Sequence, residues 1–172
     1  LGRPMIQVIL CDDHALIRRG IRDTLSDASD IQVVGEAGDY GELRTLMRTL
    51  GSAEDHKDRP CDVLVLDINL PGRSGLDVLH ALKDEGTNVK VLIVSMYPED
   101  QYAIRALRAG AHGYVNKGGD PQLLVQAVKP PQLLDRRGVV VHAQIEHDVR
   151  EARIAAVPLH DKERGRLLAA PV

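Results

Sequence analysis

Short apolar runs alternate with amphipathic helical patterns along most of this chain, from Met5 to Val128. Between the runs, apolar side chains recur every three or four residues, which is typical of one buried face of a helix. This alternation predicts an α/β domain with a parallel sheet and helices on both of its faces. The predicted strands cover residues 6–11, 31–37, 63–67, 89–95 and 113–115.

Carboxylates stand at the ends of two of these strands. Asp12 and Asp13 follow the first strand directly, and Asp67 is the last residue of the third. If the two strands are neighbours in a parallel sheet, the three acids converge at its carboxyl edge, where open α/β sheets bind their ligands. Like charges crowded at one edge repel each other unless a cation joins them, so the pattern predicts a metal site.

Length and composition fit a soluble protein with one domain and a tail, because 172 residues with 44% hydrophobic content cannot form two full domains. The chain has no uninterrupted apolar stretch of about 18 residues and no signal-peptide pattern at its start, so we expect a cytoplasmic protein with no membrane partner. The net charge of −3 does not by itself indicate a nucleic-acid surface. Cys11 and Cys61 lie at opposite ends of their strands, which predicts free thiols.

The remaining segments are predicted from their turn residues. Residues 51–60 are polar and charged, with glycine and proline at their ends, and predict an exposed loop. A last helix should begin after Asp120 and end before the two prolines at 130–131. Beyond it, residues 138–141 are compatible with a short strand and residues 143–156 with a charged helix.

The chemically distinctive residues occur in an order that resembles the receiver domain of two-component response regulators. The details resemble the LuxR/NarL/FixJ-type subfamily, whose receivers precede a LuxR-type helix-turn-helix. The motifs are Asp12-Asp13-His14, Asp67-Ile68-Asn69-Leu70-Pro71-Gly72-Arg73-Ser74-Gly75, Ser95, and Gly113-Tyr114-Val115-Asn116-Lys117.

The resemblance covers about residues 5–128, which would form the receiver domain. It implies a flavodoxin-like, doubly wound sheet of five parallel strands in the order 2-1-3-4-5. Residues 129–172 would be a linker or tail, or the truncated approach to a helix-turn-helix DNA-binding domain. Residues 158–168 faintly resemble the entry to such a domain, but no recognition helix fits before the chain ends.

The resemblance also implies a phosphorylation site. A carboxylate attacks a phosphoryl group when a divalent cation offsets the charge on the phosphoryl oxygens. Asp67 would be the phosphoacceptor, and a sensor histidine kinase would be the partner that phosphorylates it. Asp13, Asp67 and the backbone carbonyl of Asn69 would bind Mg²⁺ directly, and Asp12 would orient a water on the metal. Lys117 would bring an ammonium to the phosphoryl oxygens.

Two further residues are implied to carry the signal. The hydroxyl of Ser95 would move to a phosphoryl oxygen, and Tyr114 would fill the space that is vacated beneath the fourth helix. This change would shift the surface formed by helix 99–108, strand 113–115 and the last helix, where receivers usually dimerise. The chain would therefore be a non-enzymatic switch that forms a homodimer on phosphorylation and acts on DNA only through a domain not visible in this chain.

Two other functions compete with this interpretation. A phosphatase with an aspartyl-phosphate intermediate expects an acid two residues after its nucleophile, where this chain has Asn69. A phosphate-independent interaction module usually lacks one of the acids or the lysine, and none is lost here. His14 is expected to be a solvated residue at a helix start, because Mg²⁺ prefers oxygen ligands.

Overall fold

The computed structural model describes residues 5–52, 59–129 and 139–140. The main sheet contains β1 (Ile6–Cys11), β2 (Ile31–Ala37), β3 (Val63–Asp67), β6 (Lys90–Ser95), β7 (Gly113–Asn116) and β8 (Val139–Val140). Two short strands, β4 (Asn69–Leu70) and β5 (Arg73–Ser74), pair with each other directly after β3. The helices are α1 (Ala15–Ser26), α2 (Tyr40–Gly51), α3 (Gly75–Asp84), α4 (Glu99–Arg108) and α5 (Pro121–Val128).

The main sheet has the order β2-β1-β3-β6-β7-β8, and every neighbouring pair in it is parallel. Its first five strands are the five predicted from the sequence, in the predicted order, so the fold class is confirmed. Two of the predicted ranges differ by one residue, because β6 begins at Lys90 and β7 extends to Asn116. The strand expected near residue 140 is present as β8, which pairs with β7 and adds a sixth strand.

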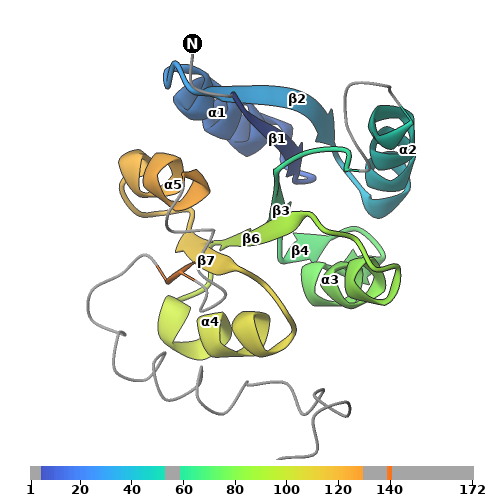
Figure 1. The fold of residues 1–172 in the computed structure, drawn as a ribbon. Helices are drawn as coiled ribbons and strands as arrows, with labels where there is room; N and C mark the ends of the chain where they lie inside the picture. The colour runs from blue at the N-terminus through green and yellow to red at the C-terminus, as the bar shows by residue number, and fades with distance from the viewer. Residues whose placement is uncertain (1–4, 53–58, 130–138, 141–172) are drawn as a thin grey trace, which may run out of the picture.

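Successive residues of each central strand enter two different cores. In β1, Val8 and Leu10 pack with side chains of α1 and α5, whereas Ile9 and Cys11 pack with side chains of α2, α3 and α4. This period of two follows from the pleat of a strand. The sheet is therefore covered on both faces, by α1 and α5 on one and by the other three helices on the other (Figure 1).

The chain turns tightly between β3 and α3, and Gly75 makes this turn possible. Its backbone N–H donates to the carbonyl of Ile68 at 2.7 Å. A Cβ at Gly75 would lie 2.3 Å from the carbonyl oxygen of Asp67, which is too close for any side chain. Ser74 and Asp77 close a capping box at the first turn of α3. The start of α3 is thus fixed against the end of β3.

The exposed loop predicted at residues 51–60 differs from the structure at its two ends. Gly51 is the last residue of α2, and Pro60 is buried rather than exposed. The reason is that the helical pattern of α2 continues to its cap at Ser52, whose hydroxyl donates to the carbonyl of Arg48 at 3.0 Å. Residues 53–58 lie outside the described residues, as does the helix predicted at residues 143–156.

The structure confirms that both cysteines are free. Burial raises the pKa of each thiol, Cys11 and Cys61, to about 12, so both are poor nucleophiles near neutral pH. Within residues 5–52, 59–129 and 139–140, no helix has the length and apolar character needed to cross a membrane.

His112 joins β6 to the start of β7 through two hydrogen bonds. The ring nitrogen Nδ1 accepts from the backbone N–H of Val91 at 3.1 Å, and the backbone N–H of His112 donates to the carbonyl of Val91 at 2.8 Å. Burial, assisted by the positive charge of Lys90, lowers the pKa of His112 to about 4. The folded state therefore requires the neutral imidazole.

We expect Gly75→Ala to lower the free energy of unfolding by more than about 2 kcal/mol, because the new methyl group collides with the backbone of Asp67. Gly20→Ala is the matched control. Gly20 lies in α1 with open space around its Cβ position, so this change should raise stability by about 0.5 to 1 kcal/mol. Urea unfolding measures both, and equal effects would contradict the steric argument.

Stability should fall as the pH is lowered from 6.5 towards 4. In this window the unfolded His112 binds a proton that the folded one rejects, so acid favours the unfolded state by up to about 3 kcal/mol. His112→Asn keeps an acceptor for Val91 but does not titrate, and should flatten this part of the profile. A profile of unfolding free energy against pH that is the same in both proteins would show that His112 does not control it.

Candidate functional site

Three carboxylates meet at the carboxyl edge of the sheet. Strands β1 and β3 are paired, with Cys11 opposite Leu66, so the residues that follow them lie side by side. Asp12 is 2% exposed and Asp67 is 3% exposed, whereas Asp13 lies at the surface. The predicted convergence of the three acids is therefore confirmed, and two of them are buried.

Lys117 joins the two buried acids. Its Nζ contacts Oδ2 of Asp12 and lies 3.1 Å from Oδ2 of Asp67. The ammonium is as deeply buried as the carboxylates, with 5% of its side chain exposed. Its position is fixed at the end of β7, where its backbone N–H donates to the carbonyl of Ser95 at 2.8 Å. The buried ammonium of Lys117 thus balances part of the charge of the two buried carboxylates.

The other oxygen of each buried acid accepts a backbone hydrogen bond. Oδ1 of Asp12 accepts from the N–H of His14 at 2.8 Å, and Oδ1 of Asp67 accepts from the N–H of Asn69 at 3.2 Å. Burial raises the pKa of Asp67 above its usual value, and the bonds from Asn69 and Lys117 act against this. Ionised Asp67 is thus held by donors but lacks full compensation of its charge.

The donor set fits a divalent cation. Asp12, Asp13, His14 and Asp67 each offer one ligand atom, and these atoms all lie within 4.8 Å of one another. Carboxylate oxygens are the hard ligands that Mg²⁺ prefers, and the uncompensated charge at Asp67 favours a cation close by. The acid cluster predicted from the sequence is therefore suited to Mg²⁺.

His14 differs from its prediction in one respect. The side chain is 59% exposed, as expected of a residue at a helix start, but its Nδ1 lies 2.8 Å from Oδ1 of Asp13 and 3.4 Å from Oδ1 of Asp12. The imidazole is therefore a neighbour of the acids and not only a solvated side chain.

Arg18 is a part of the site that the sequence did not indicate. Its Nη1 donates to the backbone carbonyl of Asp12, and its Nε donates to Glu36 at 3.1 Å. These contacts hold the turn after β1 from the side of α1 and β2. Arg18 was missed because it belongs to no local motif, and only the packing of α1 against β2 brings it to Asp12.

Ser95 and Tyr114 are both completely buried and are connected through the backbone of Tyr97. Oγ of Ser95 accepts from the N–H of Tyr97 at 3.0 Å, and the hydroxyl of Tyr114 donates to the carbonyl of Tyr97 at 3.0 Å. Nδ2 of Asn116 donates to the same carbonyl at 3.1 Å. One residue between β6 and α4 thus contacts both side chains that were predicted to respond to phosphorylation.

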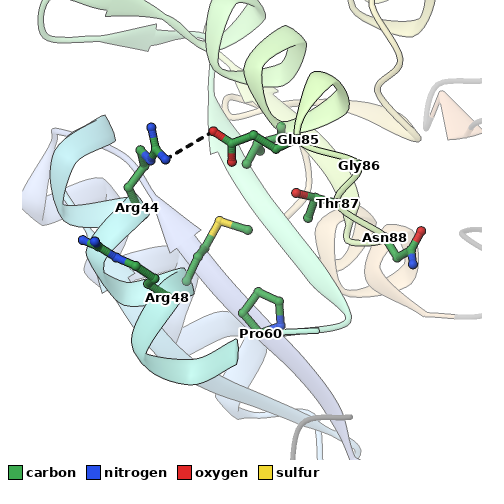
Figure 2. A pocket seen from close by; sticks show the side chains of 9 residues that line it. Arg44, Arg48, Pro60, Glu85, Gly86, Thr87 and Asn88 are labelled. Atoms are coloured by element: carbon green, nitrogen blue, oxygen red, sulfur yellow. Dashed lines mark ion pairs between the residues drawn. The ribbon is translucent and has the colours of Figure 1, made fainter. Parts of the chain in front are cut away.

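A hollow lies at the opposite edge of the sheet, between α2 and the turn after α3 (Figure 2). Pro60 and Thr87 line it and precede β3 and β6, so it lies at the amino ends of these strands. An ion pair of 3.4 Å between Arg44 and Glu85 spans its walls. It contains none of the predicted site residues, so the acid cluster remains the candidate site.

Comparison with known proteins identifies similar chains. The family model of the response regulator receiver domain matches residues 8–129. The nitrate/nitrite response regulator protein NarP of Escherichia coli is 36% identical over 123 residues, covering 72% of this chain and 53% of NarP. The response regulator GacA of Pseudomonas aeruginosa is 36% identical over 125 residues, covering 73% of this chain and 54% of GacA.

A crystal structure of a LuxR-family two-component response regulator from Aurantimonas superimposes with a TM-score of 0.71. It is 29% identical, and the match covers 87% of this chain and 99% of that one. The present chain spans about half the length of the curated relatives NarP and GacA. About half of each of these relatives therefore lies outside the region that is similar to this chain.

Removing the buried ammonium should destabilise the fold strongly. In buffer free of divalent cations, we expect Lys117→Met to lower the free energy of unfolding by about 3 kcal/mol, because Asp12 and Asp67 keep their charges without a partner. Adding Asp67→Asn to this variant should restore part of the loss. Lys83→Met, at an exposed position on α3, is the control and should change stability by less than about 0.5 kcal/mol.

Urea unfolding of the four proteins provides the comparison. If Lys117→Met matched the Lys83→Met control, Lys117 would not be the group that compensates the buried acids.

Proposed function

The chain belongs to the response regulator receiver domain family, and from this premise we propose that it is a phosphorylation-controlled switch with Asp67 as the phosphoacceptor. The observation that carries the proposal is the position of Asp67, a buried carboxylate at the end of the central strand β3, in contact with Lys117 and beside two further acids. A sensor histidine kinase would be the phosphodonor. Asn69 supports this role over that of a phosphatase, since it supplies no second acid.

Asp13 and Asp67 would hold Mg²⁺ through their carboxylates, Asn69 through its backbone carbonyl, and Asp12 through a water molecule. When bound, the ion would offset the charge on the phosphoryl oxygens. The residues themselves position the reaction. The N–H of Asn69 orients Asp67 by a bond of 3.2 Å to Oδ1, and the contact with Arg18 holds the backbone at Asp12.

Lys117 would offset part of the charge of the phosphoryl group. The phosphoryl group would carry roughly two negative charges on three oxygens, while the carboxylate of Asp67 would lose its own charge on forming the acyl phosphate. The ammonium already lies 3.1 Å from Oδ2 of Asp67, so it needs little movement to reach an oxygen attached to that group. Because Lys117 also holds Asp12, any shift of its Nζ towards the phosphoryl group changes the balance of charge within the cluster.

Ser95 and Tyr114 would transmit the signal through Tyr97. A Ser95 hydroxyl that turns to a phosphoryl oxygen gives up its bond with the N–H of Tyr97, which frees the segment between β6 and α4. The hydroxyl of Tyr114 holds the carbonyl of that residue and would follow its movement. The surface formed by α4, β7 and α5 would change as a result.

This changed surface would form a homodimer. In the complete protein, dimerisation would control an output domain that binds DNA and regulates transcription, since the chain resembles regulators with a LuxR-type helix-turn-helix and spans about half of their length. The switch would operate in the cytoplasm, where a sensor kinase has access to its phosphodonor.

We expect a small phosphodonor with Mg²⁺ to modify the protein at a single site that is labile to hydroxylamine, and Asp67→Asn to abolish the modification. Intact-mass spectrometry measures the added phosphoryl group. Asp84→Asn, at an exposed position at the end of α3, is the matched control and should be labelled normally. Unchanged labelling of Asp67→Asn would rule out this phosphoacceptor, and rapid continuous hydrolysis of phosphomonoesters would favour the phosphatase.

We expect beryllium fluoride with Mg²⁺, a mimic of the phosphoryl group, to shift the protein from monomer to dimer in sedimentation velocity experiments. Ser95→Ala should bind the mimic but dimerise at least several-fold more weakly, because it lacks the hydroxyl that responds to the phosphoryl oxygens. An identical mass with and without the mimic would exclude the dimerisation step.

A further inference from the structure

His14 is directed at the acid cluster although most of its side chain is exposed. Its Nδ1 lies 2.8 Å from Oδ1 of Asp13 and 3.4 Å from Oδ1 of Asp12. The backbone at this point is also fixed, because the N–H of His14 donates to Asp12 at 2.8 Å. The helix start therefore delivers an imidazole nitrogen to the place where the carboxylates converge.

The spacing of the four ligand atoms is compatible with one metal ion. Two ligands on opposite sides of an ion with bonds of about 2.1 Å are about 4.2 Å apart, and neighbouring ligands are about 3.0 Å apart in octahedral or 3.4 Å in tetrahedral geometry. The ligand atoms of Asp12, Asp13, His14 and Asp67 all lie within 4.8 Å of one another. The nitrogen of His14 therefore lies close enough to the carboxylates to share an ion with them, directly or, for Asp12, through a water molecule.

The chemistry of the imidazole distinguishes between ions. Mg²⁺ takes hard oxygen ligands, whereas Ni²⁺, Zn²⁺ and Cu²⁺ bind well to imidazole nitrogen. A site made of three carboxylates alone favours these transition-metal ions only as far as their general order of affinity for protein ligands does. A nitrogen ligand added to it raises the affinity for the second group of ions and leaves Mg²⁺ largely unaffected.

We propose that His14 makes this site a mixed nitrogen and oxygen site for a divalent transition-metal ion, which binds in competition with Mg²⁺. The inference rests on the metal site of the proposed function, but it does not require that Asp67 is phosphorylated. Because both kinds of ion use Asp13 and Asp67, they exclude each other. His14 therefore determines which ion occupies the site when both are present.

The test measures binding of Ni²⁺ and of Mg²⁺ to the full chain by titration calorimetry, without any phosphodonor. His14→Gln keeps a polar group that can hydrogen-bond Asp13 but removes the imidazole. We expect this variant to bind Ni²⁺ at least tenfold more weakly, with its Mg²⁺ affinity within about threefold of the original protein. The Ni²⁺ binding event that His14 controls should disappear in saturating Mg²⁺, which separates it from Ni²⁺ bound elsewhere on the chain.

His80→Gln is the matched control, because His80 is exposed on α3 away from the acids, and its Ni²⁺ affinity should not change. Equal Ni²⁺ affinity in His14→Gln and the original protein would overturn the inference. A parallel loss of Ni²⁺ and Mg²⁺ affinity would also overturn it, because His14 would then act only by positioning Asp13. Neither result bears on labelling of Asp67, so the two proposals fail independently.

Discussion

The burial of two carboxylates around one ammonium is the interaction on which the rest of the site depends. Asp12 and Asp67 are both withdrawn from water, and Lys117 contacts both. Such an arrangement is costly, because a single cation does not compensate two anions and desolvation opposes all three charges. The raised pKa of Asp67 reports this imbalance. A site of this kind has a lasting tendency to bind further positive charge.

The fold supplies the rigidity that this imbalance requires. Strands β1 and β3 are covered on both faces, so the acids at their ends cannot separate to relieve repulsion. Gly75 lets α3 begin directly against the carbonyl of Asp67, which closes the site from that side. Apolar packing therefore holds the crowded charges close together at the end of the two strands.

Hydrogen bonds connect the buried end of the site to the segment before α4. Ser95 and Tyr114 both contact the backbone of Tyr97 through their hydroxyls. The backbone N–H of Lys117 donates to the carbonyl of Ser95. Three residues of the proposed switch are therefore linked by hydrogen bonds to the segment between β6 and α4.

Much of the molecule follows from local sequence patterns. The alternation of apolar runs and helical spacing predicted five strands of the main sheet, three with the observed bounds and two with a difference of one residue. The acids at the strand ends predicted the cluster. This works because burial on both faces imposes apolar runs on parallel strands, and because residues after such strands must lie at the carboxyl edge. The end of α2 was predicted less well, since polar residues continue a helix as readily as they begin a loop.

Only the tertiary structure determines which groups of the site are in contact. Lys117 stands 105 residues from Asp12 in sequence, and only the register of β7 against β6 carries its ammonium to the acids. No sequence pattern indicates that Arg18 contacts the carbonyl of Asp12. The same holds for the direction of the imidazole nitrogen of His14. The sequence determined which chemical groups reach the edge of the sheet, because that depends on period and strand ends. Which groups touch depends on register and packing, and these exist only in the folded chain.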